Sequence, residues 1–404
     1  MAIAVPDTRT RGRVDARRVA RDVQTRTRAG RLGAWTAPAL GLFGIVILLT
    51  VVGLVFVGSA SSVTSLHKYG NSWYYFRRQL RWAAFGSIAM ALTTYISYRR
   101  WQRLAVVVLV VSVLGTLATF SPLGITKNGS ARWIGPSSFA IQPSEILKFA
   151  VAVSLAALFT FRVDVIDDFQ TSIKPALILL LVTVGPVFLQ PDMGTAMILL
   201  ITAASLFAVS GMSARRLGSL AAAGVVLTLF LAWIEPYRRD RLLAFLHPTQ
   251  DVSGIGYHVF QSKLGFSGGR LFGVGVGASR AKWGFLPNSF TDFIFAIIGE
   301  ELGLIGAALV LGLFLAIAVI GLLAAGRAPD RFGMLLATGI TTWIVAQAII
   351  NMGAVIGTMP VTGVPLPFIS AGGSSFVVVM GAVGVLVNIA RQGIRPERRA
   401  SATA

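Results

Sequence analysis

The chain has 404 residues, of which 55% are apolar and only 13% are charged, and its mean hydropathy is +0.74. A soluble domain carries about a quarter charged residues, so this composition excludes an ordinary soluble protein and predicts an all-α polytopic membrane protein. The net charge of +20 raises the question of nucleic-acid binding. Its arginines lie in a terminal arm and in short loops, which favours membrane topology and excludes nucleic acid as a partner.

Two residue types limit the chemistry further. The chain has no cysteine, which excludes disulfides, thiolate metal sites and cysteine nucleophiles. Its three histidines (His67, His247 and His258) are scattered along the chain and do not form a zinc-binding pattern.

The first 35 residues form a basic arm. Nine arginines lie before residue 32, and no cleavable signal pattern is present. We expect residues 1–35 to be a disordered cytoplasmic tail attracted to anionic lipid. Residues 36–391 are predicted to form one transmembrane domain, and residues 392–404 a short cytoplasmic tail.

About ten membrane-spanning helices are predicted from the apolar runs. They lie near residues 37–57, 83–97, 104–121, 145–161, 173–189, 194–211, 217–234, 291–322, 333–352 and 371–390. Arginine clusters in the short loops place both termini in the cytoplasm. The loops at 58–82, 122–144, 190–193, 235–290 and 353–370 then lie outside.

The loop between spans 7 and 8 is unusually long. Residues 235–290 contain seven basic side chains, namely Arg238, Arg239, Arg241, Lys263, Arg270, Arg280 and Lys282. Connections of this length tend to be functional. Its glycine run at 267–279 follows no predicted strand, so we interpret it as a tight chain reversal at the membrane surface rather than a nucleotide site.

Acidic residues recur where inward-running spans begin at the outer surface. Glu145 follows Pro143, Asp192 follows Pro191, and Asp292 opens span 8. Each acid alone is explained by helix capping, because carboxylates favour helix N-termini. Three such acids also predict one outward-facing cavity, because ionisable residues within a membrane protein are functional candidates by default.

Other charged residues accompany these acids. Glu145 and Lys148 are three residues apart and share a helix face, where they either brace the cavity or place an ammonium group near an anionic ligand. Glu300 and Glu301 are expected on opposite faces of span 8, bracing it internally. Arg132 and Trp133 lie in the outer loop before span 4, where an aromatic belt explains Trp133 as well as a site does.

Together these groups suit a lipid-linked diphosphate sugar. Arginine and lysine suit a diphosphate, and Asp292 suits a general base that takes a proton from a hydroxyl group. A transporter of the same lipid remains open at this point.

Several stretches of the sequence resemble the SEDS family (shape, elongation, division and sporulation), in particular its FtsW branch. They lie between about residues 128 and 376. They read NGSARWIG…IQPSEILKFA, QPDMGTA, YRRDRLLAFLHP, SRAKWGFLPNSFTDFIFAIIGEELGLIG and NMGAVIGTMPVTGVPLPFISAGGSS.

The resemblance implies a peptidoglycan glycosyltransferase that polymerises lipid II during cell division at the bacterial inner membrane. It implies that Asp292, in the T-D-F motif, is the catalytic residue. The predicted substrate-binding set is Arg132, Trp133, Glu145, Lys148, Asp192, Arg238, Arg241, Lys282 and Ser370. It also implies a divalent cation (Mg²⁺ or Mn²⁺, with Asp292 as the candidate ligand), a class B penicillin-binding protein as partner, and other division proteins.

The chain departs from the family pattern at three positions. Phe290 stands where the family usually has the histidine of H-T-D-F, Ala371 where it has a tyrosine, and His247 where it often has an aspartate. These departures leave open a division scaffold without activity, and a lipid II flippase stays open as a separate alternative.

Overall fold

The computed structural model describes residues 35–127, 130–136, 139–234, 239, 245, 255–287 and 289–393. The predicted tails at 1–35 and 392–404 fall almost entirely outside these residues. Within the described residues, one helix is found at the position of each predicted span. These helices are α2 (Ala37–Tyr69), α3 (Tyr74–Tyr95), α4 (Arg99–Ala118), α5 (Pro143–Phe161), α6 (Lys174–Leu189), α7 (Met193–Val209), α8 (Ala214–Ile234), α11 (Ile294–Gly326), α12 (Arg331–Ile356) and α13 (Ser374–Gln392).

The chain is a multi-pass membrane protein. Among the described residues, seven helices are long and apolar enough to cross a bilayer: α2, α4, α5, α6 with the preceding π-turn (Phe169–Ile173), α11, α12 and α13. Helix α7 is apolar but shorter, and α3 contains three arginines in its first half. Apolar helices suit lipid because their backbone groups are hydrogen-bonded internally.

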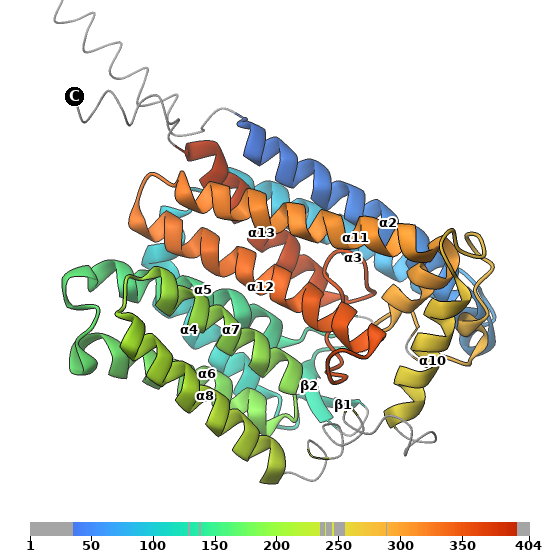
Figure 1. The fold of residues 1–404 in the computed structure, drawn as a ribbon, viewed down its shortest axis with the longest axis horizontal. Helices are drawn as coiled ribbons and strands as arrows, with labels where there is room; N and C mark the ends of the chain where they lie inside the picture. The colour runs from blue at the N-terminus through green and yellow to red at the C-terminus, as the bar shows by residue number, and fades with distance from the viewer. Residues whose placement is uncertain are drawn as a thin grey trace, which may run out of the picture.

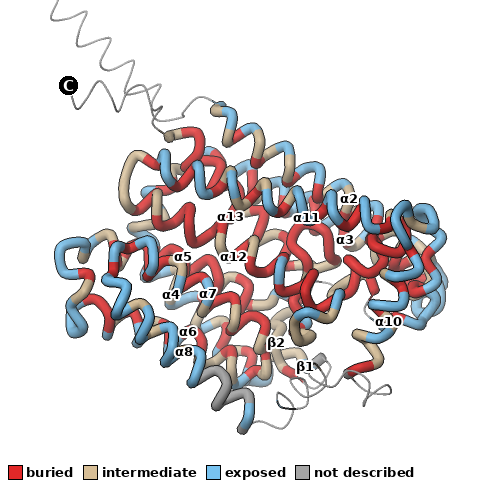
Figure 2. Tube along the Cα trace, viewed as in Figure 1, coloured by how far each residue is buried: buried red, intermediate tan, exposed pale blue. Residues whose placement is uncertain are grey.

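Helices α5, α12 and α13 form the centre of the bundle. Most of their residues are buried, whereas α2 and α4 bury only one side and present Leu, Ile and Val outward (Figure 2). Contacts join α13 to α3, α5 to both α4 and α7, and α11 to both α2 and α12 (Figure 1). The central helices are therefore shielded from lipid by the others.

The connections between helices gather at two opposite ends. At one, the terminal end, Arg391 lies over the Trp35 ring at 4.9 Å, and the Tyr98 hydroxyl donates to Asp330 Oδ2 at 2.8 Å. At the other, the loop end, lie β1, β2, α10 and residues 357–373 (Figure 1). Both ends of the described chain therefore lie on the same side of the bundle.

The predicted outer loop at 58–82 is wrong in extent. Helix α2 continues to Tyr69 and α3 begins at Tyr74, so only residues 70–73 form the connection. The apolar run ends near residue 57, but the serines that follow do not end the helix, because this part of α2 packs against other residues of the loop end. Gly70 ends α2 with φ 65°, a left-handed conformation that glycine adopts at little cost.

A two-stranded hairpin departs from the predicted all-α class. Strand β1 (Gly124–Lys127) pairs antiparallel with β2 (Ser130–Ile134) in the loop before α5. The sequence carried its signal, because Asn-Gly between two short β-prone runs is the strongest local predictor of a hairpin.

Helix α11 is broken near its outer end. Gly303 has φ 69° and ψ −166°, so a short outer piece precedes the long membrane helix. The predicted loop at 267–279 fills the break: Val274 N–H and Gly275 N–H donate to the carbonyls of Glu300 and Glu301. On the far side of the break, Leu304 N–H donates to the Arg270 carbonyl at 2.9 Å. The glycine run is therefore a reversal, but it passes against α11 instead of lying freely at the surface.

Candidate functional site

Asp292 lies in a turn that directly precedes α11 at the loop end. Asn351 of α12 donates from Nδ2 to the Asp292 carbonyl at 2.8 Å and to the Val364 carbonyl at 2.7 Å. The Ser370 hydroxyl donates to the Thr291 carbonyl at 2.6 Å. The backbone on both sides of this carboxylate is therefore fixed by side chains from two other segments, while the Asp292 residue itself stays partly exposed.

Residues 357–373 form an irregular segment opposite Asp292. A Cβ atom added at Gly363 would lie 3.7 Å from Asp292 Oδ2, so the segment passes close to the carboxylate. Gln347 of α12 donates to the Pro365 carbonyl at 2.9 Å, and Leu366 N–H donates to the Ser370 hydroxyl at 2.8 Å. These bonds satisfy non-helical backbone that is buried among protein groups, where orphaned polar groups are costly.

Glu145 and Lys148 form a fully buried ion pair below this segment. Lys148 Nζ lies 2.7 Å from Glu145 Oε2 and donates to Gln347 Oε1 at 2.8 Å. It also lies 5.5 Å from the centre of the Trp343 ring. Gln347 accepts a hydrogen bond from Lys148 and donates one to the Pro365 carbonyl. The ion pair therefore supports residues 357–373, the segment that faces Asp292. Of the two interpretations of this pair, the geometry favours bracing.

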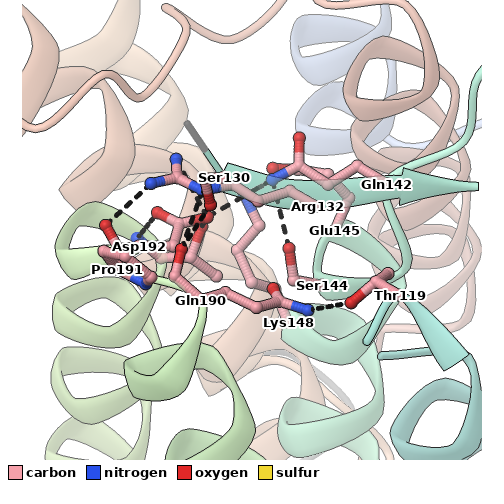
Figure 3. A network of polar contacts seen from close by, with 11 residues as sticks. Thr119, Ser130, Arg132, Gln142, Ser144, Glu145, Lys148, Gln190, Pro191 and Asp192 are labelled. Carbon is pink, nitrogen blue, oxygen red and sulfur yellow. Dashed lines mark hydrogen bonds and ion pairs between the residues drawn. The ribbon is translucent and has the colours of Figure 1, made fainter. Parts of the chain in front are cut away.

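Arg132 and Asp192 lie in a second polar cluster beside the start of α5 (Figure 3). Arg132 donates from NH2 to the Pro191 carbonyl at 2.7 Å and from Nε to the Gln190 carbonyl at 3.0 Å. Its NH1 lies 3.9 Å from Asp192 Oδ2. Asp192 caps α7 through Thr195 N–H at 3.1 Å. Asp192 therefore has the capping role expected from its position. Arg132 attaches the β1–β2 hairpin to the residues that precede α7.

Gln142 joins this cluster to the centre of the bundle. Its Nε2 donates to Ser144 Oγ at 3.1 Å and to Asp192 Oδ2 at 3.3 Å (Figure 3). Its backbone N–H donates to Ser374 Oγ of α13 at 3.0 Å. The starts of α5, α7 and α13 therefore meet at Gln142. Trp133 lies half-buried on β2, opposite Ile125.

Lys282 belongs to a third cluster, built on the outer piece of α11. Its Nζ lies 3.7 Å from Glu301 Oε1 and donates to the Gly277 carbonyl. The same Glu301 oxygen accepts from Ser59 of α2 at 2.8 Å. Glu300 accepts from the Ser279 hydroxyl at 2.5 Å and from Arg280 N–H at 2.9 Å.

The bracing role expected of the two glutamates is thus what the structure shows. The expectation that they point to opposite faces is wrong, because both carboxylates receive bonds from Ser279. The break at Gly303 and the loop wrapped around it bring donors to both.

Two members of the predicted set cannot be placed, because Arg238 and Arg241 lie outside the described residues. A cavity of about 800 Å³ lies elsewhere at the loop end, lined by residues 268–274 with Ala278, Arg280 and Glu300. It includes no residue of the predicted set.

The structure adds side chains that the sequence argument missed. Gln347 and Asn351 are buried amides in a mostly apolar helix. Such amides are costly unless hydrogen-bonded, and this is the signal that could have found them. Their spacing of four residues places both on one face of α12, toward residues 357–373.

Two of the departures from the family pattern lie together. Ala371 N–H donates to the Phe290 carbonyl at 3.0 Å, and the Phe290 ring packs on Tyr75 at 4.6 Å. The chain therefore has an aromatic contact on the segment leading to Asp292, where a polar side chain is usual in the family that the sequence resembles.

A metal site made of protein side chains alone is not found in the part of the chain that the structure describes. No group of three or more His, Asp or Glu residues gathers there. Protein-bound Mg²⁺ is commonly held by one or two carboxylates together with substrate phosphates. Asp292 fits only the arrangement in which one carboxylate and the substrate phosphates hold the ion together.

Comparisons with known proteins show which sequences and structures this chain resembles. Residues 40–394 match the family model FtsW/RodA/SpoVE, described as a cell cycle protein. The stage V sporulation protein E of Bacillus subtilis is 38% identical over 88% of this chain and 98% of its own length. A probable peptidoglycan glycosyltransferase FtsW of Geobacter metallireducens is 38% identical over 85% of this chain and 92% of its own.

Solved structures share the fold. One, described as showing structural coordination of polymerization and crosslinking by a peptidoglycan synthase complex, matches with a TM-score of 0.72 and 26% identity over 88% of this chain and 98% of its own. The rod shape determining protein RodA of Thermus thermophilus matches with a TM-score of 0.64 and 24% identity over 90% and 98%.

Proposed function

The chain belongs to the FtsW/RodA/SpoVE family of cell cycle proteins, and from that premise we propose that it is a peptidoglycan glycosyltransferase that polymerises lipid II during cell division. Two relatives that are 38% and 37% identical over the aligned residues are named probable peptidoglycan glycosyltransferase FtsW. The observation that carries the proposal is the position of Asp292, a partly exposed residue at the loop end whose backbone is fixed by Asn351 and, through Thr291, by Ser370.

The proposed step is a displacement at an anomeric carbon. Asp292 takes the proton from the sugar 4-hydroxyl of one lipid II, and that oxygen bonds to the anomeric carbon of the lipid-linked glycan as undecaprenyl diphosphate leaves. A general base that is fixed within reach of the hydroxyl contributes about 10²–10⁴-fold to the rate of such a step. Asn351, Ser370 and the Gln347–Lys148 brace hold the backbone around the base.

The basic residues have different parts in this proposal. Arg132 keeps 16% of its side chain exposed at the loop end, where its guanidinium suits a diphosphate. Lys148 and Lys282 are buried in their ion pairs and support the fold of the site from behind. Asp292 would be the residue that holds a Mg²⁺ or Mn²⁺ ion, which would supply positive charge to stabilise the leaving diphosphate.

The location and partners follow from the same proposal. We place the terminal end in the cytoplasm and the loop end outside the inner membrane, at the division septum, where lipid II is presented. The partner proposed is a class B penicillin-binding protein. The solved peptidoglycan synthase complex with the same fold supports it, and other division proteins would join the pair.

The test is lipid II polymerisation by the purified protein with its cognate class B partner. Asp292→Asn should lower the initial rate on the order of a hundredfold or more while the complex stays intact. Asp164→Asn, which removes an exposed carboxylate at the terminal end, should leave the rate unchanged.

Either alternative would have its own signature. Full activity of Asp292→Asn would remove the aspartate from the mechanism. No glycan from the wild type, combined with transfer of labelled lipid II across vesicles, would favour the flippase. No glycan and no transfer, with Asp292→Ala still supporting division, would favour the scaffold to which Phe290 and Ala371 point.

A further inference from the structure

The loop that follows α10 (Ile255–Gly268) presents large apolar side chains on its outer surface. Its most exposed ones are Phe272 and Trp283, which are 77% and 65% exposed, followed by Val276 and Phe285. Exposed apolar surface of this kind marks a contact with lipid or with another protein. In Figure 1 the loop, drawn in gold, lies beside the outer ends of α2 and α11.

The length of α11 places this loop at the outer boundary of the bilayer. From Leu304 to Gly326 the helix rises about 33 Å, slightly more than the roughly 30 Å of a hydrocarbon layer. The N–H groups of Leu304 and Ile305 donate to the carbonyls of Arg270 and Leu271. Both donor residues are exposed on the apolar surface of α11. The loop therefore lies where the membrane-spanning part of α11 begins.

Helix α2 gives the same depth independently. From Ala37 to Ser59 it also rises about 33 Å. The Ser59 hydroxyl donates to Glu301 Oε1 at 2.8 Å, and Lys282 Nζ of the loop lies 3.7 Å from the same oxygen. The loop therefore continues the apolar surfaces of two helices at the level where lipid headgroups meet acyl chains, which favours lipid over water as its surroundings.

Two arginines line a cavity at this level. The cavity of about 800 Å³ is bounded by residues 268–274 with Ala278, Arg280 and Glu300. Arg270 and Arg280 are exposed, and neither guanidinium group has an ion pair or hydrogen bond with a described residue. The Glu300 carboxylate already accepts from the Ser279 hydroxyl and from the N–H groups of residues 280 and 281. Two cations are therefore available to a ligand, beside one acid that is fully hydrogen-bonded.

The backbone of Arg270 supports a role for its side chain. Its φ of 48° lies in the left-handed region, which glycine adopts without strain and other residues seldom adopt. Leu304 N–H holds the Arg270 carbonyl at 2.9 Å, and Gly273 N–H donates to the Gly269 carbonyl at 2.7 Å. Residues held in such conformations are concentrated at functional sites.

We propose that residues 270–285 form a phospholipid site in the outer leaflet. The exposed apolar side chains of this loop enter the acyl region, and Arg270 and Arg280 bind the phosphate of an anionic phospholipid at the cavity. Guanidinium groups bind phosphate oxygens through paired hydrogen bonds, and basic groups at a membrane surface attract anionic lipid. The inference goes beyond the proposed function, because it involves no reaction at Asp292.

The depth of the loop can be measured because the chain has no cysteine. Phe272→Cys carries a bimane fluorophore in vesicles of phosphatidylglycerol and phosphatidylcholine. We expect quenching by lipids brominated in the acyl chain and protection from aqueous iodide. Val106→Cys on α4, 70% exposed, is the lipid reference, and Asp164→Cys, exposed at the terminal end, is the water reference. Val276→Cys replaces Phe272→Cys if gel filtration shows that the latter does not fold.

Headgroup preference is measured with the same label. In equal mixtures of the two lipids, only one is brominated at a time, and the ratio of quenching gives their relative affinity at residue 272. Phosphatidylglycerol should be favoured on the order of tenfold. Arg270→Gln with Arg280→Gln should bring this ratio close to one. Arg100→Gln with Arg103→Gln removes two exposed arginines at the terminal end and should leave the ratio unchanged.

Four results would overturn the inference. Quenching by iodide without quenching by brominated lipid would place the loop in water. A preference that survives the loss of both arginines would remove them from the site. A preference abolished by inorganic phosphate at constant ionic strength would indicate a site for free anions. Loss of lipid quenching on addition of the class B partner would assign the surface to that protein. None of these measurements requires polymerase activity, so the proposed function stands or falls separately.

Discussion

Five described acids lie at the loop end, and their surroundings separate them. Glu145, Asp192, Glu300 and Glu301 are buried, and each is bound to a lysine, an arginine or a set of backbone and hydroxyl donors. Asp292 is the partly exposed one, and its neighbours fix its backbone. A buried carboxylate of this kind stabilises structure, whereas an accessible one on a rigid turn can meet a substrate.

The buried pair at Lys148 leads to a stability prediction. Lys148→Met should destabilise the protein by about 3–5 kcal/mol, because it leaves the Glu145 carboxylate buried without its partner. The double variant Glu145→Gln with Lys148→Met should recover part of that loss, since neither charge is then buried. Thermal unfolding in detergent measures both.

Lys174→Met is the control for that experiment, because Lys174 is exposed and lies near the terminal end. It should leave the unfolding temperature nearly unchanged. Equal effects of Lys148→Met and Lys174→Met would contradict the bracing role assigned to the pair.

At the scale of elements, the break in α11 joins the large loop to the site. The outer piece of α11 follows Asp292 directly, and its exposed carbonyls are occupied by N–H groups of residues 274 and 275. Glu300 and Glu301 add side-chain hydrogen bonds to residues 279–281, and Glu301 forms an ion pair with Lys282. The loop and the helix start therefore form one hydrogen-bonded unit, and a change in the loop reaches the turn that holds the base.

Gly303 is the position on which this unit depends. A Cβ there would lie 2.4 Å from Gly273 N and 2.5 Å from the Leu271 carbonyl oxygen, and its φ of 69° suits glycine alone. Gly303→Ala should lower both the unfolding temperature and the polymerisation rate, and should make residues 269–282 more sensitive to protease. Strain and lost backbone bonds of this kind cost about 1–3 kcal/mol.

The same helix provides a matched control. A Cβ at Gly312 of α11 would meet nothing within 4 Å. Gly312→Ala should therefore be neutral or mildly stabilising, because alanine favours helix more than glycine does. If both substitutions behaved alike, the proposed unit of loop and helix would not exist.

At the scale of the whole molecule, the two ends differ in the chemistry they present. The terminal end carries Arg99, Arg215, Arg216 and Arg331 near its connections, which is the arginine distribution typical of a cytoplasmic face. Burial of Tyr98 and its bond to Asp330 raise the pKa of this hydroxyl above its usual range, so the contact that joins two of these connections persists throughout the physiological range. The loop end carries the Asp292 site.

The absence of cysteine makes the orientation directly measurable. Ser121→Cys, exposed at the loop end, should react with a membrane-impermeant maleimide in intact cells. Ser213→Cys, exposed at the terminal end, should react only after the membrane is opened. The reverse labelling pattern would invert the proposed topology and place Asp292 on the side away from the proposed substrate.

Much of this could be predicted from the sequence. Long apolar runs predicted a helix for each span, because in lipid a backbone must satisfy its own hydrogen bonds. Pro143 before Glu145, Asp192 before α7 and Asp292 before α11 predicted where helices start, because capping is local chemistry. The loop at 58–82 was predicted too long, since the serines after residue 57 lower hydropathy without ending the helix.

Only the tertiary structure decided which charged groups face a substrate and which are buried in pairs. Gln347 is 199 residues from Lys148, and Asn351 is 59 from Asp292, and no local pattern joins such residues. The stacking of His258 on Phe293 likewise depends on how α10 folds back over α11. By itself the sequence determined the membrane class and the helix starts, because these follow from hydropathy and capping within a few residues. The structure decided the site, because buried polar groups select their partners from whatever the folded chain brings within hydrogen-bonding distance.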